Sequence, residues 1–233
     1  MFKLISRYFT PRHITNALKT SGRFLCDFIA PPACNFCNLF LEKRTVFCDV
    51  CTNKIQQVVS CNLEVTKKYG LKVFAVGAYK DPLKKLILAK RWSCVVSSKQ
   101  LAQLILAMPQ VQLQKYDYII SVPLHWMRRA SRGFNQSYEM ALYLHEQCGV
   151  QLADILKRNR HTQFQSDLTQ EQRITNLKGA FSLKKVDRAL YKDKHLLLVD
   201  DVMTTGATLH AAARELIKLR PSSITAVVAC RAL

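Results

Sequence analysis

Residues 194–209 read Lys-His-Leu-Leu-Leu-Val-Asp-Asp-Val-Met-Thr-Thr-Gly-Ala-Thr-Leu, and this stretch decides the fold. Residues 196–199 form a short, continuous apolar run, as expected for a parallel strand that is buried on both faces. From residue 207 to residue 219 the apolar spacing becomes helical. The stretch therefore predicts a strand, a loop and a helix, which is the repeating unit of an α/β domain.

The polar residues after the apolar run suggest a ligand. Asp200 and Asp201 come where the strand is expected to end, and ligands of open α/β sheets bind at such ends. Adjacent carboxylates can accept hydrogen bonds from vicinal hydroxyls or hold a hydrated Mg²⁺. The loop at 204–208 would direct backbone N–H groups and three threonine hydroxyls to one point at a helix N-terminus, and Gly206 would let the backbone approach a phosphate closely. Together these groups favour a ribose phosphate, although an ordinary strand, turn and helix with a threonine-rich cap is the plainer alternative.

At residues 197–209 the sequence resembles the thirteen-residue signature of type I phosphoribosyltransferases, which in that family binds phosphoribosyl pyrophosphate (PRPP). The resemblance implies an α/β fold with a parallel sheet flanked by helices, and Mg²⁺ as the companion of PRPP. It also implies that Asp200 and Asp201 contact the ribose 2′ and 3′ hydroxyls. The residues that would wrap the 5′-phosphate are Thr204, Thr205, Gly206, Ala207 and Thr208.

A second loop carries groups suited to a pyrophosphate. Residues 116–122 predict another apolar strand, and a loop with one histidine and three arginines follows it. Arginine and histidine donors suit a pyrophosphate leaving group, although a solvated basic loop is the alternative. Asn135 is expected to cap the helix that runs through Cys148. The residues of this loop assigned to PRPP are Pro123, Leu124, His125, Arg128 and Arg129.

Two C-x-x-C pairs predict a metal site. Cys34 and Cys37 are separated by ten residues from Cys48 and Cys51, a spacing that lets each pair give two thiolates to one tetrahedral Zn²⁺. Four thiolates fill the coordination sphere, so the zinc should be structural. Thiol redox chemistry is the alternative. Cys61 has no partner two residues away, so a second metal site is not indicated.

Charge and length limit the class of protein. The chain has 233 residues, with 35 Lys and Arg against 16 Asp and Glu, for a formal net charge of +19. Such a surface attracts polyanions, whether PRPP, nucleotides, nucleic acid or acidic lipid headgroups. No apolar run approaches the roughly 18 to 20 residues that span a bilayer, and the first nine residues lack an apolar signal core. We therefore expect a cytoplasmic protein with no transmembrane segment.

The order of the motifs along the sequence predicts two domains. Residues 1–70 are expected to form an N-terminal helix and the four-cysteine zinc module, and residues 71–233 a phosphoribosyltransferase-like domain. The helix at 14–29 either contacts a membrane surface or packs beside the metal site. The domain should contain strands at 71–79, 151–156 and 224–230, helices at 82–90 and 97–108, and a lid at 158–173. The basic and aromatic cluster at Lys84, Lys85, Lys90, Arg91 and Trp92 either contacts phosphates or bases or is a solvated helix face.

Taken together, these motifs resemble the ComF family, which is phosphoribosyltransferase-like and associated with bacterial competence. The residues that carry the resemblance are those from Cys34 to Cys51, Val122 to His125, Arg132 to Gln136, Arg160, Thr162, Gln165, Leu168, Arg173, Asn176 and the PRPP signature. The resemblance implies a PRPP-binding protein that acts in DNA uptake for natural transformation and contacts single-stranded DNA or a DNA-processing partner. The alternative is an active phosphoribosyltransferase that transfers ribose 5-phosphate to a base or amine in nucleotide metabolism. The sequence identifies no catalytic residue.

Overall fold

The computed structural model describes residues 31–88, 94–124, 133–159 and 179–232. Contacts divide the chain into two compact units, Met1–Thr52 and Asn53–Leu233. The boundary expected after residue 70 falls instead within a hairpin of the second unit, because strand β1 (Cys61–Thr66) pairs with strand β2 (Tyr69–Ala78). Of the first unit, residues 31–52 are described, and they include the short helix α2 (Asp49–Thr52).

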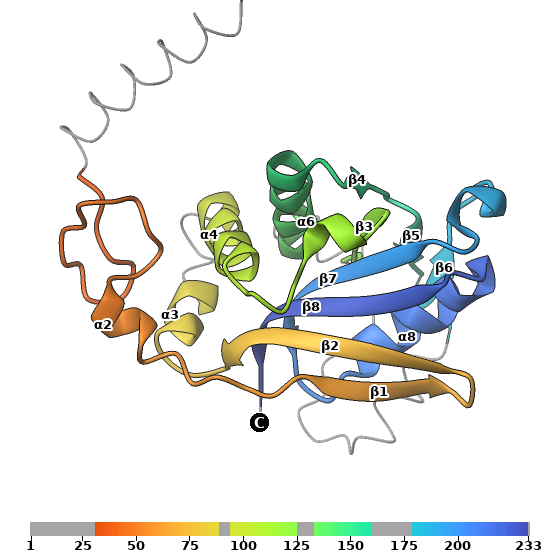
Figure 1. Cartoon of the computed structure of the whole chain (residues 1–233), viewed down its shortest axis with the longest axis horizontal. Coiled ribbons are helices and arrows are strands. Elements are labelled where there is room, and N and C mark those ends of the chain that lie inside the picture. The colour runs from red at the N-terminus through yellow and green to blue at the C-terminus, as the bar shows by residue number, and fades with distance from the viewer. Residues whose placement is uncertain (1–30, 89–93, 125–132, 160–178, 233) are drawn as a thin grey trace, which may run out of the picture. The chain divides into compact units, whose positions relative to one another are not determined.

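The second unit is built on a six-stranded sheet in the order β1-β2-β8-β7-β3-β4 (Figure 1). Every neighbouring pair is parallel except β1 and β2, so the predicted parallel α/β sheet is confirmed. The strands not yet bounded are β3 (Tyr118–Ser121), β4 (Gln151–Leu152), β7 (His195–Met203) and β8 (Ser223–Arg231).

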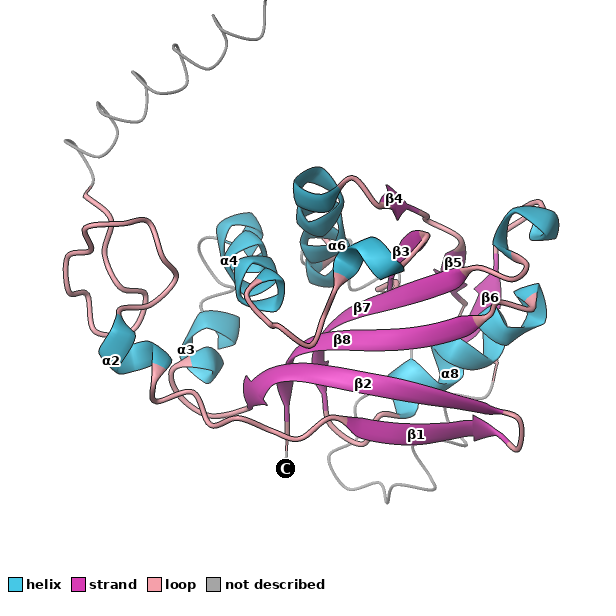
Figure 2. Cartoon of the chain, viewed as in Figure 1, coloured by secondary structure: helices cyan, strands magenta, loops and turns pink. Residues whose placement is uncertain are grey.

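Helices cover both faces of this sheet (Figure 2). The helices α4 (Cys94–Leu106) and α6 (Gln136–Cys148) pack side by side on one face, and α8 (Ala207–Leu216) covers the other. The short elements are α3 (Leu83–Leu88), the 3-10 turns Leu113–Lys115, Arg188–Tyr191 and Ile217–Leu219, and a separate antiparallel pair, β5 (Leu156–Arg158) with β6 (Phe181–Leu183). Among the helices of the described ranges, none combines the length and apolar character that crossing a membrane requires.

Strand β7 lies at the centre of the sheet, between β3 and β8. Its residues Leu196, Leu197, Leu198 and Val199 are completely buried, as the apolar run predicted. The strand also extends to Met203, which is farther than the run, because β8 continues beside it and pairs with it to the end. The two aspartates are therefore held in the strand itself.

Three predicted elements differ from those observed. The strand expected at 151–156 is two short strands in different sheets, β4 and β5, with a break at residues 153–155. The helix expected at 207–219 is α-helical to Leu216 and ends in a 3-10 turn. The helix at 14–29, most of the lid at 158–173, and Lys90, Arg91 and Trp92 lie outside the described residues.

The structure predicts that Gly77 in β2 has no room for a side chain. A Cβ there would lie 2.6 Å from Ile55 Cγ2 and 3.0 Å from the carbonyl oxygen of Gln56. That oxygen is held in place because it accepts the N–H of Ala78 at 2.9 Å. Gly77→Ala should therefore lower the free energy of unfolding by about 1 to 3 kcal/mol. Gly70→Ala is the matched control in the same strand, because nothing lies within 4 Å of its added Cβ. Urea unfolding measures both, and equal effects would contradict this packing.

Candidate functional site

A cavity of about 660 Å³ opens at the carboxyl ends of the parallel strands. Its walls come from the ends of β3, β7 and β8, from the segment after β2 and from the start of α8. This volume suits a small-molecule ligand. The cavity contains these residues assigned to PRPP from the sequence: Pro123, Leu124, Asp200, Asp201, Thr204, Gly206, Ala207 and Thr208. Thr205 does not line it, and His125, Arg128 and Arg129 lie outside the described residues.

The two aspartates differ in their surroundings. Asp200 is 8% exposed, and its Oδ1 accepts hydrogen bonds from Ser137 Oγ at 2.8 Å and from the backbone N–H of Asp201 at 2.9 Å. Asp201 is half-buried, and its Oδ1 accepts the backbone N–H of Val202 at 2.7 Å. Both residues line the cavity. The site therefore contains one nearly enclosed carboxylate and one that is more open to a ligand.

Burial, together with the neighbouring charge of Asp201, raises the pKa of Asp200 to about 7. The hydrogen bonds from Ser137 and from the Asp201 N–H oppose this rise because they stabilise the carboxylate, and the positive charge of Arg158 opposes it as well. Asp200 therefore holds a proton more tightly than an exposed aspartate does.

The start of α8 offers donors to an anion. Gly206 is the N-cap residue, with φ of 77°, a left-handed conformation that suits glycine. It supplies no side-chain cap, so a ligand could use the first amides of the helix. A Cβ at this position would also lie 2.7 Å from Leu63 Cδ1. The glycine therefore serves the backbone conformation and the packing on β1, besides the approach to a phosphate that the sequence suggested.

The sequence analysis did not identify three residues of the site, two in the cavity lining and one behind it. Tyr79 follows β2 and lines the cavity; its pKa is raised by burial first, then by Cys230 and Asp201. Arg158, at the end of β5, also lines the cavity, with its guanidinium carbon 5.3 Å from the centre of the Phe181 ring. The third is Ser137, through its hydrogen bond to Asp200. The end of β2 was a usable signal for Tyr79, because parallel strands share their carboxyl edge.

Helix α6 begins where the sequence predicted, but its N-cap residue does not cap it in the predicted way. Asn135 is the N-cap residue, but its side chain makes no capping hydrogen bond. Instead its Nδ2 donates to the carbonyl oxygen of Val122 at 3.0 Å. The side chain therefore ties the beginning of α6 to the end of β3, which is one wall of the cavity.

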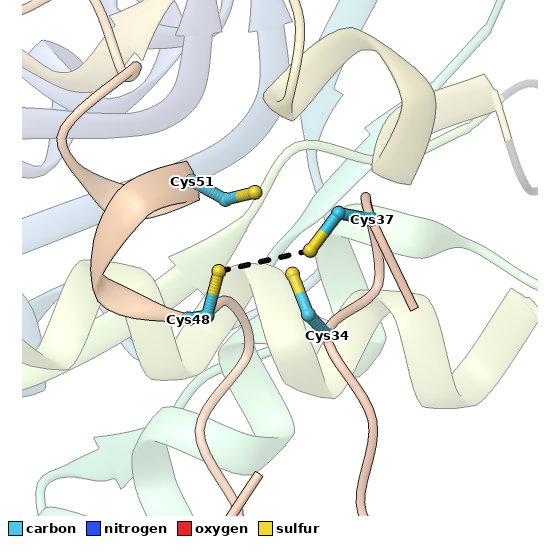
Figure 3. A group of neighbouring side chains, drawn as sticks. All are labelled: Cys34, Cys37, Cys48 and Cys51. Carbon is cyan, nitrogen blue, oxygen red and sulfur yellow. Dashed lines mark hydrogen bonds between the residues drawn. The ribbon is translucent and has the colours of Figure 1, made fainter. Parts of the chain in front are cut away.

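The four predicted cysteine ligands converge in the first unit (Figure 3). The sulfur atoms of Cys34, Cys37, Cys48 and Cys51 all lie within 4.8 Å of one another, and those of Cys37 and Cys48 are 3.7 Å apart. Sulfurs at about 2.3 Å from a tetrahedral Zn²⁺ are separated by about 3.8 Å, so the cluster could bind a structural metal ion such as zinc. Cys61 and Cys148 are half-buried and Cys230 is buried; these three cysteines lie outside this cluster.

The thiols of the cluster ionise unequally. Burial alone would raise the pKa of Cys34, but hydrogen bonds from the backbone N–H groups of Cys37, Cys48 and Phe36 stabilise its thiolate and lower the pKa to about 6. Burial raises the pKa of Cys51 to about 12, and the other three thiols raise it too. A bound cation would remove this conflict, since metal ligation deprotonates the thiols together.

We expect about one equivalent of bound zinc, which elemental analysis of the purified protein measures. Cys34→Ser should lose the metal and destabilise the first unit, because metal binding and folding are coupled in such sites. Cys61→Ser is the control, since this free cysteine lies outside the cluster. Full zinc content in Cys34→Ser would contradict the assignment.

The raised pKa of Asp200 predicts a pH dependence of stability. The folded protein binds this proton more tightly than the unfolded chain, so the contribution to stability is greatest at low pH and falls as the pH rises to about 7. Asp200→Asn removes the titration. The melting temperature of wild type minus that of the variant should therefore decrease between about pH 5 and pH 8. A difference that stays constant or increases over this range would contradict the raised pKa.

Comparison with known proteins gives three kinds of match to this geometry and sequence. Residues 129–233 match the family model described as the phosphoribosyl transferase domain. Competence protein F of Haemophilus influenzae is 39% identical over 109 residues, which cover 46% of this chain and 47% of that protein. DNA utilization protein YhgH of Shigella flexneri is 32% identical over 172 residues, or 70% of this chain and 73% of that protein. Among solved structures, the purine phosphoribosyltransferase of Pyrococcus horikoshii has 18% identity and a TM-score of 0.33, over 60% of this chain and 83% of that one.

Proposed function

We propose a function for this chain, which belongs to the ComF family: it binds PRPP or a related ribose phosphate and acts in DNA uptake for natural transformation. The observation that supports this ligand is the cavity at the ends of the strands. A pair of carboxylates and a hydroxyl-rich helix N-terminus line the same cavity. The names of the relatives, a competence protein and a DNA utilization protein, support the process.

The cavity suggests how the ligand would lie. The 5′-phosphate would meet the first amides of α8 with Thr204 and Thr208, and the ribose would lie beside the aspartates. The pyrophosphate would extend toward Pro123 and Leu124, and from there toward the basic residues expected at 125–129. Mg²⁺ would enter with the pyrophosphate, because this ion usually keeps several waters and binds through substrate phosphates. Zinc in the cysteine cluster would have a structural role.

The partner on the DNA side is single-stranded DNA or a DNA-processing protein. The formal net charge of +19 supports a contact with a polyanion, because basic side chains release counterions from the phosphates. We place the protein in the cytoplasm, because a reducing compartment keeps the thiolates of a metal site available to the metal.

An active phosphoribosyltransferase in nucleotide metabolism is the second candidate. The observation that favours it is that Ile87, Leu88 and Tyr79 also line the cavity, because apolar and aromatic side chains suit a base. Product analysis after mixing the protein with PRPP, Mg²⁺ and a panel of bases and amines distinguishes the two functions, since only an enzyme consumes PRPP.

The ligand is tested by calorimetric titration of PRPP with Mg²⁺. Wild type should bind one equivalent, and Thr208→Val should bind at least about tenfold more weakly, because a hydrogen bond to a charged group contributes about 1.5 to 3 kcal/mol. Thr225→Val is the matched control, because it makes the same substitution in β8 at a residue that does not line the cavity. It should leave the affinity for PRPP unchanged. Absence of binding by folded wild type would contradict the proposal.

The DNA contact is tested by fluorescence anisotropy with a labelled single strand. Binding should weaken steeply as salt rises, and charge reversal at Arg128 and Arg129 should weaken it further. No binding at low salt, or no effect of the reversal, would leave a DNA-processing protein as the partner.

A further inference from the structure

The exposed sides of helices α3 and α4 combine lysines with large aliphatic side chains. The two helices belong to the second unit and contact each other and β8 (Figure 1). On their inner sides, α3 buries Leu83, Leu86 and Ile87, and α4 buries Leu101 and Ile105. We call the exposed residues of α3 and of the first turns of α4 the α3–α4 surface; they are Lys84, Lys85, Leu88, Val95, Val96 and Lys99.

The aliphatic side chains of this surface are open to solvent. Leu88, Val95 and Val96 are 56%, 41% and 56% exposed. Single exposed apolar side chains are ordinary on a protein surface, and Val59 and Leu190 are examples in the same unit. Three of them on two helices that contact each other form a group, and such groups mark interaction surfaces. The α3–α4 surface therefore has an apolar part that a partner could bury.

The charge of this part of the chain has one sign. Residues 82–116 contain five lysines and one arginine but no aspartate or glutamate. Three of these lysines, Lys84, Lys85 and Lys99, are exposed on the α3–α4 surface. Two of them precede the aliphatic residues in the sequence and one follows them. A local field of one sign attracts an extended anion, so the partner should be negatively charged as well as apolar.

Two kinds of extended anion could meet this surface, and the aliphatic side chains favour one of them. Single-stranded nucleic acid offers phosphates to the lysines, but its bases stack on aromatic side chains. The described residues of the α3–α4 surface include no aromatic side chain. A bilayer that contains anionic lipids offers phosphates to the lysines and hydrocarbon to the leucine and the valines. Long lysine side chains can also keep their ammonium groups at the headgroups while their stems lie along apolar surface.

We propose that the α3–α4 surface docks the protein on an anionic lipid membrane. Its three aliphatic side chains enter the boundary between headgroups and acyl chains, and its three lysines contact the headgroup phosphates. The inference goes beyond the proposed function and does not depend on it, because the three lysines and the two valines do not line the cavity. Leu88 does line it, so the surface reaches the edge of the cavity.

Flotation of the full chain with vesicles tests this contact, after circular dichroism has verified that every variant is folded. Wild type should bind vesicles of phosphatidylcholine mixed with phosphatidylglycerol, should bind vesicles of phosphatidylcholine alone far more weakly, and should lose affinity as salt rises. The double variant Lys84→Glu/Lys85→Glu should bind the anionic vesicles more than about tenfold more weakly, since each lysine near such a surface strengthens binding by about fivefold.

The control for charge is Lys67→Glu/Lys68→Glu. It reverses two adjacent exposed lysines in the turn between β1 and β2, so the net charge changes by the same amount away from the α3–α4 surface. Its effect on vesicle binding should be much smaller.

Val96→Gln tests the aliphatic part separately, because it leaves the charge unchanged. It should weaken binding to the anionic vesicles by about threefold to tenfold, since the hydrocarbon no longer buries a valine side chain. Val59→Gln is the matched control at a valine that is 86% exposed in the same unit, and it should bind as wild type does. All these variants retain residues 1–30, so any lipid contact of that segment is common to them.

The outcomes decide between lipid, nucleic acid and net charge. No binding of folded wild type to anionic vesicles would overturn the proposal. Equal losses in the two double variants, or equal binding by Val96→Gln and Val59→Gln, would overturn it as well. The same proteins are titrated with a labelled single strand: if Lys84→Glu/Lys85→Glu weakens DNA binding while Val96→Gln leaves vesicle binding unchanged, the surface belongs to nucleic acid. Absence of PRPP binding by wild type would refute the proposed ligand and leave this contact intact.

Discussion

The parallel pairing of β7 with β3 on one side and β8 on the other is the constraint on which the rest of the second unit depends. Its four apolar residues are completely buried, which fixes the strand between two helical layers. Its longer pairing with β8 carries Asp200 and Asp201 past the end of β3. Because parallel strands end at the same edge, this arrangement brings the ends of β2, β3, β7 and β8 around one cavity.

A buried carboxylate at such an edge is costly unless polar groups surround it, and Asp200 has them. Ser137 and the Asp201 N–H donate to it, and the charge of Arg158 also favours its ionised form. These groups come from a helix, the strand itself and a separate hairpin. The polar network therefore connects three parts of the chain that meet only in the folded state.

In the first unit, the closely spaced ionisable groups are thiols rather than carboxylates. Four thiols within 4.8 Å of one another cannot all ionise without a cation. Backbone hydrogen bonds lower the pKa of Cys34, whereas burial and the neighbouring thiols raise that of Cys51. Residues 31–52 contain one short helix, and the isolated bridge between Ala33 and Phe40 is their only pairing outside named strands. A metal ion bound by the cysteines would therefore contribute much of the folding free energy of so small a unit.

Local sequence patterns were sufficient to predict that β7, α8 and the cysteine cluster are present. In each case the decisive residues are close in sequence, and periodicity or spacing reports directly on the geometry. Contacts between distant segments were not predictable in this way. Asn135 was expected to cap its own helix, but Val122 offers its side chain a tertiary acceptor. Arg158 belonged by sequence to a polar stretch, and only its pairing in the β5–β6 hairpin directs it to the cavity.

The sequence did not predict the boundary between the two units, because this boundary also depends on contacts between distant segments. The segment before residue 70 follows the cysteines closely in sequence, so composition assigned it to the metal module. Strand β1 instead joins the sheet as its antiparallel edge, and its Leu63 contacts the loop at Gly206. A long-range contact of this kind leaves no signal in the spacing of the residues that make it.

A crystal structure of the protein grown with PRPP and Mg²⁺ would show directly whether the cavity binds this ligand. We expect density for a ribose phosphate in the cavity at the ends of β3, β7 and β8, with its 5′-phosphate over the first turn of α8 and a ribose hydroxyl within hydrogen-bond distance of Asp200 or Asp201. A fully occupied ligand bound elsewhere on the protein, or a phosphate placed away from the start of α8, would contradict it.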